Sequence, residues 1–571
     1  MVGALSHHAP TRAQPTAGAA RTLSDDTLPW PVHPGPPAPP SGPSAAPPRR
    51  AWPSALGRTT GAMAVGTLLS RLTGFARLFV LAYALGINPL ADAYNLANNT
   101  PNIIFDLVIG GVLSATFIPV FVDRLATRSD DEAWQAISSV VTLSAVLLVV
   151  VTIVFVILAP VIIDLYTLAN NSATAADQRA VATTLLRLFA PQVAFYGAVA
   201  LITALLNARR RFVVPMFVPI LNNVVVIGVL LEVAHLVHHP TLQGIRHDQG
   251  ILLLLGIGTT MGVVVQAFAL IPSLWRARTH LRWRWDRHND AVRTIMRLSG
   301  WTFGFVLANQ IANFVVLALA DTIAGGVSAY NYAAMFFQLP YGIVAVSIMT
   351  AIQPDLAERW STADLDGFRR RLSAGLRAIL VVLLPAAVGY LVLARPIIAL
   401  VLGHGAVGVE GTRSTASTMA LFAVGIPGFS AYLFLMRAYQ AMQDTRTAFF
   451  MYLIENGINI VLAFALYRPL GTKGLALSFS IAYTVATGVA LWDLRRKGIG
   501  VDIRMIARPV LRVAVICVVM ALVVALVSAA IGYPSGVGLL LRVLGSVAAG
   551  VAVFVLAAGL AAQVRLRRGR A

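Results

Sequence analysis

Two arginines, Arg71 and Arg77, lie inside the first stretch of the sequence that is apolar enough to cross a membrane, residues 61–86. A charged side chain at bilayer depth costs at least about 2.5 kcal/mol, so such a helix turns its arginines toward protein, water or a charged ligand. The guanidinium fork suits phosphate oxygens. The pair predicts a polar cavity that handles an anion. The alternative is that each arginine only pairs with a buried carboxylate or carbonyl and fixes packing.

The spacing of the two arginines raises a geometric problem. On a regular helix of ~3.6 residues per turn, they would stand about 240° apart and would not share a face. Gly74 lies between them, and a bend there would bring both to one cavity. We take Gly74, and Pro101 in the next apolar stretch, as candidate hinges.

Two carboxylates belong to the second apolar stretch. Asp92 opens it and is interpreted either as a helix N-cap or as a functional group. Asp106 lies about halfway along and needs a cation at that depth. A proton or a sodium ion could serve, but we favour an ion pair with Arg71 or Arg77.

Asparagines recur at spacings of three and four in the second apolar stretch and again in the seventh. Such spacing places amides along one stripe of a helix. These stripes either tie membrane helices together or contact a ligand. If they face each other, they make a cavity polar on both sides. The candidate substrate-binding amides are Asn98, Asn102, Asn309 and Asn313.

The composition indicates the elements that carry these residues. The chain of 571 residues is 57% hydrophobic and 12% charged, whereas a soluble domain has roughly 25% charged residues. Repeated apolar runs of about 20 residues predict an all-α integral membrane protein. We expect fourteen spans, near 61–86, 92–122, 137–166, 181–206, 212–235, 250–275, 297–320, 327–355, 372–402, 415–440, 447–467, 474–494, 508–531 and 538–563.

The basic residues set the orientation. The net charge of +20 is concentrated in alternate short loops, such as 207–212 and 275–288, which favours membrane topology over nucleic-acid binding. Both termini are therefore predicted to be cytoplasmic. The single cysteine, Cys517, excludes a disulfide within the chain. With no P-loop, no nucleophile–base spacing and no metal-ligand spacing, we expect neither an enzyme nor a cofactor or metal site.

An internal repeat divides the spans. Ala93-Tyr94-Asn95 opens the second span and Ala329-Tyr330-Asn331 opens the eighth, 236 positions later. Spans 1–6 and 7–12 thus look like two parallel copies of a six-helix lobe, an arrangement that places a transport site between the halves. The predicted organisation is a disordered cytoplasmic Pro-rich tail (1–55), an N-lobe (61–275), a basic amphipathic cytoplasmic linker (276–296), a C-lobe (297–494), an added helix pair (508–563) and a basic tail (564–571).

Residues 70–121 resemble the start of the MurJ/MviN family of lipid II flippases, within the multidrug/oligosaccharidyl-lipid/polysaccharide exporter superfamily. The likeness is carried by S-R-x-x-G-F-x-R at 70–77, D-A at 92–93, P-N at 101–102 and F-x-P at 117–119. It implies a central cavity for an anionic headgroup and a groove near spans 13 and 14 for a prenyl tail. Arg71, Arg77 and Asp92 match essential residues of the family. Two further family arginines fall on Phe105 and Met335 here.

The resemblance leads to an expected function. The protein would move a lipid-linked peptidoglycan precursor (lipid II) across the bacterial cytoplasmic membrane by alternating access, with an ion gradient or the membrane potential biasing the cycle. The alternatives are a flippase for another polyprenyl-linked oligosaccharide, a drug exporter, and a non-transporting scaffold whose Pro-rich tail docks cell-wall synthesis proteins. Paired arginines argue against an exporter of cations. Deleting residues 1–55 would disable a scaffold but spare a flippase.

Overall fold

The computed structural model describes residues 54–105, 113–277, 279–532 and 536–568, and every regular element within these ranges is a helix. Residues 55–571 form one compact unit, and the following account concerns that unit. The Pro-rich segment predicted to be a tail lies outside the described residues, except for its last two positions.

The helices of the first half precede the interlobe linker. They are α1 (Ser54–Leu85), α2 (Pro89–Phe105), α3 (Leu113–Thr127), α4 (Asp130–Tyr166), α5 (Ala175–Phe189), α6 (Gln192–Ala208), α7 (Val213–Leu236), α8 (Leu242–His247) and α9 (Gln249–Arg276). The helices of the second half are α10 (Asp290–Ala320), α11 (Gly326–Pro340), the π-helix η3 (Tyr341–Ala345), α12 (Val346–Ser361), α13 (Leu365–Leu402), α14 (Val409–Ala441), α15 (Thr445–Leu470) and α16 (Thr472–Arg496). The last two are α17 (Ile503–Ile531) and α18 (Val537–Arg568).

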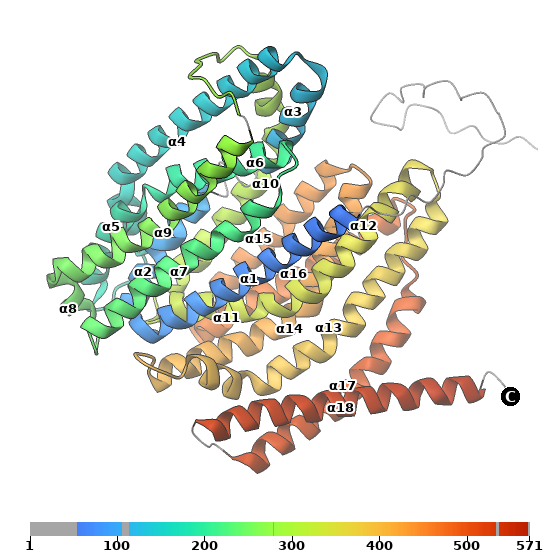
Figure 1. Cartoon of the computed structure of the whole chain (residues 1–571). Coiled ribbons are helices and arrows are strands. Elements are labelled where there is room, and N and C mark those ends of the chain that lie inside the picture. The colour runs from blue at the N-terminus through green and yellow to red at the C-terminus, as the bar shows by residue number, and fades with distance from the viewer. Residues whose placement is uncertain (1–53, 106–112, 278, 533–535, 569–571) are drawn as a thin grey trace, which may run out of the picture. The chain divides into compact units, whose positions relative to one another are not determined.

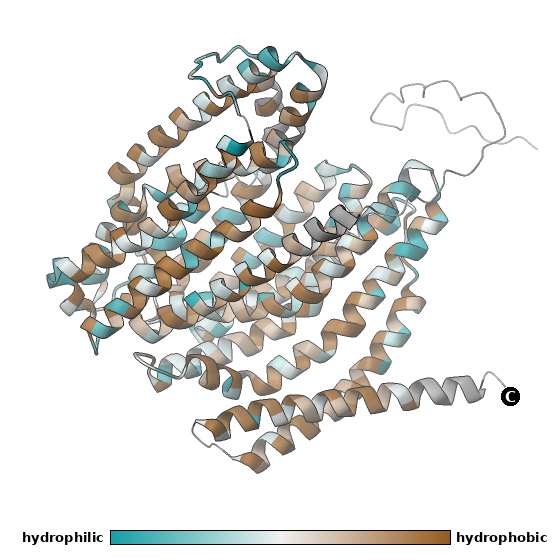
Figure 2. Ribbon diagram, in the orientation of Figure 1, coloured by the Kyte–Doolittle hydropathy of each residue, from teal (hydrophilic) through white to brown (hydrophobic). Residues whose placement is uncertain are grey.

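The predicted membrane spans are largely recovered. Among the described residues, 12 helices are long and apolar enough to cross a membrane, and Val306–Ala320 within α10 is a shorter apolar helix. Apolar residues run along the length of these helices in Figure 2. Each of the thirteen corresponds to one expected span. The second of the fourteen expected spans, residues 92–122, corresponds to α2 and α3, and residues 106–112 between them lie outside the described part. The prediction of an all-α membrane fold is confirmed.

The helices pack mainly within each half. In the first half α7 packs on α9 and α2 on α5, and in the second α14 packs on both α13 and α16 (Figure 1). The halves touch through α2 with α11 and α4 with α10. The last two helices, α17 and α18, pack against each other and against α13. They are therefore attached to the second half, as an addition to the repeated helices.

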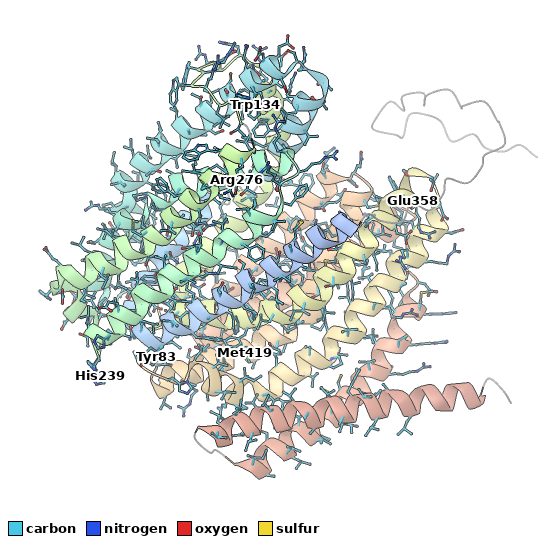
Figure 3. All side chains as sticks on the ribbon, in the orientation of Figure 1. Tyr83, Trp134, His239, Arg276, Glu358 and Met419 are labelled. Atoms are coloured by element: carbon cyan, nitrogen blue, oxygen red, sulfur yellow. The ribbon has the colours of Figure 1, made fainter. Side chains whose placement is uncertain are left out.

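The two ends of the bundle differ in charge. One end carries the arginines of loops 209–212 and 279–289, and we call it the Arg-rich end. The other carries loops 86–88, 321–325 and 403–408, which contain neither Arg nor Lys, and we call it the Arg-poor end. Figure 3 marks the two ends of the first half, with Trp134 and Arg276 at the first and Tyr83 and His239 at the second.

The predicted interlobe linker spans the gap between two helices. Helix α9 ends at Arg276 and α10 begins at Asp290, and the described residues between them, 277 and 279–289, are not helical. The linker backbone lies along α4, where the N–H of Arg282 donates to Ser138 Oγ (3.1 Å) and that of Arg284 to Thr142 Oγ1 (3.1 Å). Trp283 is exposed. An exposed tryptophan flanked by arginines fits a segment that rests at the membrane interface.

Candidate functional site

Helix α1 lies at the boundary between the halves and positions both candidate arginines. On one side, Asn223 Nδ2 of α7 donates to the carbonyl of Ser70 (3.2 Å) and to Thr73 Oγ1 (3.0 Å). On the other side, the Phe75 ring meets that of Phe336 in α11 edge to face, with 5.2 Å between centroids. The helix runs unbroken through Gly74, and α2 likewise runs through Pro101.

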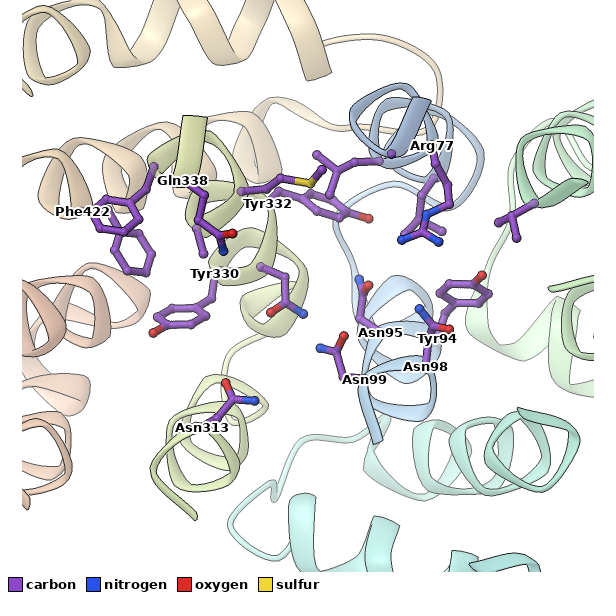
Figure 4. Close-up of a pocket in the computed structure, with 18 of the residues that line it drawn as sticks. Arg77, Tyr94, Asn95, Asn98, Asn99, Asn313, Tyr330, Tyr332, Gln338 and Phe422 are labelled. Carbon is purple, nitrogen blue, oxygen red and sulfur yellow. The ribbon is translucent and has the colours of Figure 1, made fainter. Parts of the chain in front are cut away.

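A cavity of about 640 Å³ lies beside α1, between the two halves (Figure 4). Arg77 enters it from α1, Asn98 and Asn99 from α2, and Asn313 from α10. Among the described residues that line the cavity, Arg77 is the only charged one. The site therefore combines one fixed cation with neutral hydrogen-bonding groups, which suits an anionic, polar ligand.

The two walls of the cavity differ chemically. The first-half wall is rich in amides, with Asn95 accompanying Asn98 and Asn99. The second-half wall is largely aromatic, and Phe337 contacts Phe422 and Phe479 with ring centroids 5.4 and 5.3 Å apart. An aromatic floor opposite several amides suits a ligand that has both polar edges and apolar faces.

The arginines do not share the cavity. Arg77 lines it together with Tyr94 of α2. Arg71 is exposed, and its Nη1 packs so closely over Gly342 of η3 that a Cβ there would lie 2.6 Å from it. Since the helix is unbroken, Arg71 lies ~9 Å nearer the Arg-rich end at ~1.5 Å per residue. It stands at the rim, beside the cavity-lining Tyr341.

Asp92 is bound to the opposite half rather than to an arginine. It is 1% exposed, and its Oδ1 accepts hydrogen bonds from the backbone N–H of Ser328 (2.8 Å) and from Ser328 Oγ (2.7 Å). Asn95 Nδ2 also donates to Ser328 Oγ (3.0 Å). Asp92 and Ser328 are separated by 236 positions, the offset of the internal repeat. Equivalent residues that meet in this way lie beside the pseudo-two-fold axis.

The other predicted site residues lie in several environments. Asn102 Nδ2 donates to the carbonyl of Asn98 within α2 (3.0 Å), and Asn309 Oδ1 accepts from Asn456 of α15 (3.4 Å). Neither is among the residues that line the cavity. Asp106 lies outside the described residues. The described part of the chain contains no group of three or more His, Cys, Asp and Glu residues that could hold a metal ion.

A second polar contact links the halves near the Arg-poor end. Asp321, at the end of α10, accepts hydrogen bonds from Asn170 Nδ2 (2.9 Å) and from Gln178 Nε2 (2.5 Å) of the first half. Together with Asp92, Asn95 and Ser328, these residues form what we call the latch cluster. Because it joins the halves beyond the cavity, it holds the Arg-poor side together.

Backbone contact at Gly325 gives a first prediction. Gly325 has φ +73, and a Cβ there would lie 2.7 Å from the carbonyl oxygen of Ile87 in the opposite half. The left-handed conformation alone costs an L-residue about 1–2 kcal/mol. Gly325→Ala should therefore shift the protein about tenfold away from the state closed at this end. Spin-label distances between the halves would measure the shift. Gly457→Ala, which adds its Cβ in open space, should leave them unchanged, and an unchanged distance in Gly325→Ala would contradict the prediction.

The carboxyl of Asp321 gives a second prediction. Burial raises its pKa to about 6, although Asn170 and Gln178 donate to it and Arg179 lies nearby. In an open state, water would return the pKa to about 4. Between these values the closed state binds more protons, so closure is favoured as the pH falls. The closed fraction should rise several-fold between about pH 7.5 and pH 5 in spin-label measurements. Asp321→Asn should remove most of this dependence, and an equally steep dependence in that variant would rule out Asp321 as its source.

Two charged residues near the cavity escaped the sequence analysis. Arg437 lies in α14, within a predicted span, and hydrogen-bonds Gln440 Oε1 through its Nη1 (3.1 Å). Glu455 of α15 is 1% exposed and interacts with Tyr483. Each is a lone charge within an apolar span, and that pattern alone could have identified them.

A family model described as lipid II flippase MurJ matches residues 81–546. The chain belongs to this family. The match begins after Arg71 and Arg77, so the S-R-x-x-G-F-x-R segment precedes the matched region.

Curated relatives carry the same family name. A probable lipid II flippase MurJ of Thermotoga maritima is 27% identical over 444 residues, covering 77% of this chain and 85% of the relative. A lipid II flippase MurJ of Burkholderia cenocepacia is 26% identical over 444 residues, covering 76% of this chain and 82% of the relative. Both alignments span most of the membrane bundle.

Solved structures share the fold. A lipid II flippase MurJ in an inward closed conformation matches with a TM-score of 0.73 and 22% identity, covering 88% of this chain and 99% of that one. An inward-facing multidrug resistance MATE family transporter of the MOP superfamily matches with a TM-score of 0.61 and 13% identity, covering 75% and 95%. The helical fold of this chain is thus shared with both proteins.

Proposed function

We propose that this member of the MurJ family is a flippase that moves a lipid-linked peptidoglycan precursor, lipid II, from the inner to the outer leaflet of the bacterial cytoplasmic membrane. The observation that carries the proposal is Arg77, a lone fixed cation in an amide- and aromatic-lined cavity between two lobes. A pyrophosphate needs such a cation, and a saccharide offers edges for amides and faces for aromatic rings. No covalent step is required, so the protein would act as a transporter and not as an enzyme.

The residues have distinct roles in this proposal. Arg77 binds the pyrophosphate inside the cavity, while Arg71 and Arg437 attract it at the rim. Asn98 and Asn313 contact the polar headgroup. Asp92 keeps the two halves in contact at the latch cluster until the substrate enters. An ion gradient or the membrane potential shifts the equilibrium between the two orientations of the lobes.

The orientation and the domain bounds are part of the proposal. The Arg-rich end faces the cytoplasm, and both termini lie there, because short basic loops remain on that side. The lobes comprise residues 61–275 and 297–494, and the linker between them follows the cytoplasmic surface. In this orientation the latch cluster lies on the outer side, so the structure is the state that is closed toward the outside.

An apolar groove provides a place for the lipid tail. It has a volume of about 420 Å³ and lies between α13 and α17, where Leu384, Val388 and Val392 face Cys517 and Leu522. Every residue that lines it is apolar. A prenyl chain would gain burial there at about 25 cal/mol per Å² of apolar surface, while its headgroup occupies the cavity.

A second candidate function is favoured by Met335. This residue lines the cavity at a position where the family resemblance leads us to expect an arginine. A cavity with one arginine inside has less charge for a pyrophosphate than the family pattern, so another polyprenyl-linked oligosaccharide is the alternative cargo. Both cargoes share the phosphate-linked lipid, and they differ in the saccharide that the amides would recognise.

Rescue of a cell depleted of its own lipid II flippase tests the proposal. The chain should restore growth and the appearance of lipid II in the outer leaflet. A well-expressed, membrane-inserted chain that restores neither would reject lipid II as the cargo. Expressing the chain in strains that lack a flippase for another polyprenyl-linked oligosaccharide would then test the second candidate.

A further inference from the structure

A second pocket, separate from the central cavity, lies where the last helix meets the second half. It has a volume of about 550 Å³ and is lined by α13, α14 and α18. Three arginines reach it, one from each helix: Arg395, Arg413 and Arg542. Pro396, Ala416 and Leu539 supply apolar surface beside them. The pocket thus offers cations and apolar contacts together, as an amphiphilic anion requires.

Carboxylates are few on the helices that line this pocket. Residues 503–571, which include α17 and α18, contain no Asp or Glu, and neither do residues 367–409. Glu410 pairs with Arg413 at 3.4 Å, and both side chains are exposed. One carboxylate therefore stands against three guanidinium groups, which leaves a net attraction for an anion.

Arg542 distinguishes this pocket from ordinary surface arginines. It is only 5% exposed, and its Nε donates to Ser528 Oγ of α17 at 2.8 Å. An arginine that merely extends to the headgroup region would keep its charged end in water. Here the guanidinium is oriented by a serine and enclosed by protein, which is typical of a built binding site.

The pocket lies at the depth of lipid headgroups. Arg395 precedes the end of α13 by seven residues, Arg413 follows the start of α14 by four, and Arg542 follows the start of α18 by five. At ~1.5 Å per residue these positions lie ~6–11 Å from the helix ends. All three ends belong to the Arg-poor side of the bundle. The arginines therefore occupy one level near one membrane surface.

An apolar path leads away from the pocket. On α13, Val392 of the apolar groove precedes Arg395 by three positions, and Val388 and Leu384 continue at intervals of four. Residues at these spacings lie on one face of a helix. A hydrocarbon chain attached to a group bound at Arg395 could thus follow α13 into the groove between α13 and α17.

From this geometry we infer a binding site for the phosphate headgroup of an anionic phospholipid of the outer leaflet. Arg395 and Arg542 bind the phosphate oxygens, and one acyl chain lies against α13. Its place in the outer leaflet rests on the orientation proposed above, but the site does not depend on the transported cargo. A phospholipid bound there would stabilise the packing of α18 against the second half.

Native mass spectrometry of the purified full-length protein tests this site. Phosphatidylglycerol and phosphatidylcholine would be titrated into wild type, an Arg395→Gln/Arg542→Gln double variant and Arg468→Gln. Arg468 is exposed near the Arg-poor end of α15 and serves as the matched control. We expect the double variant to bind phosphatidylglycerol about tenfold more weakly, because charge-assisted hydrogen bonds to phosphate are lost. Wild type should bind phosphatidylcholine, which has no net charge, more weakly than phosphatidylglycerol, and the control variant should bind phosphatidylglycerol as wild type does.

Several results would overturn the inference. If the double variant and Arg468→Gln bind phosphatidylglycerol equally well, Arg395 and Arg542 do not bind the phospholipid. Equal affinity for phosphatidylcholine would exclude recognition of net charge, and competition by inorganic phosphate at similar concentrations would indicate a free-anion site. Displacement by a polyprenyl pyrophosphate would reassign the site to the cargo. If the double variant does not fold, Arg395→Gln alone, at an exposed position, should weaken binding about threefold.

Discussion

Arg77→Ala is expected to reduce flipping of the lipid-linked precursor by about 10- to 100-fold, the largest loss from a single change in the cavity. Among the described lining residues, no other charge remains to bind a pyrophosphate. Hydrogen bonds to charged groups contribute about 1.5–3 kcal/mol each, and 1.4 kcal/mol is a factor of ten. The measurement is the initial rate at which labelled precursor reaches the outer leaflet of reconstituted vesicles.

Two further variants separate recognition from net charge. Arg77→Lys keeps the charge but loses the planar fork, so we expect about a tenfold loss if two phosphate oxygens are bound together. Arg468→Ala removes an exposed arginine outside the cavity and should transport normally. Full transport by Arg77→Ala would remove the basis for a phosphate site on α1. A wild-type rate in Arg77→Lys would reduce the role of Arg77 to simple attraction.

The spans could be predicted because one physical requirement dominates them. A backbone in lipid must satisfy its own hydrogen bonds, so apolar runs of about 20 residues become helices wherever they occur. Finer features need tertiary information. The π-helix at Tyr341–Ala345 follows Pro340, which lacks a backbone N–H. Neither its length nor its contact with Arg71 is encoded in hydropathy.

The candidate site was predicted in part. Arg77 is among the residues that line the cavity and Arg71 is not, and a role in binding stays a prediction for both. The helix remains unbroken at Gly74, so the rotation between the two residues keeps them apart. For Asp92 the sequence left a helix N-cap or a functional group open, and in the structure its carboxylate accepts from Ser328 of the other half. The repeat offset alone could have suggested the pairing, because a two-fold axis brings equivalent residues together.

The second large effect is expected for Asp92→Ala. This change removes the acceptor of two hydrogen bonds and leaves the backbone N–H of Ser328 buried without it. An unsatisfied buried donor costs about 1–3 kcal/mol, which corresponds to a 5- to 150-fold shift away from the closed state. The shift can be measured by the reaction of Ile87→Cys with a thiol reagent that does not cross membranes. The native Cys517 is buried and should contribute little background. Ser172→Ala, at an exposed serine near the same end, should not change the reaction.

Asp92→Asn distinguishes two explanations of this carboxylate. Its Oδ1 can still accept from Ser328, so the closed state should persist and Ile87→Cys should stay protected. If Asp92 must also exchange partners with an arginine during the cycle, the neutral amide cannot replace it and transport should fall at least tenfold. If Ile87→Cys stays protected in Asp92→Asn but transport is lost, the negative charge of Asp92 is needed at a step after closure. Protection with normal transport would limit Asp92 to the latch cluster, and loss of protection would mean that the charge itself holds the halves together.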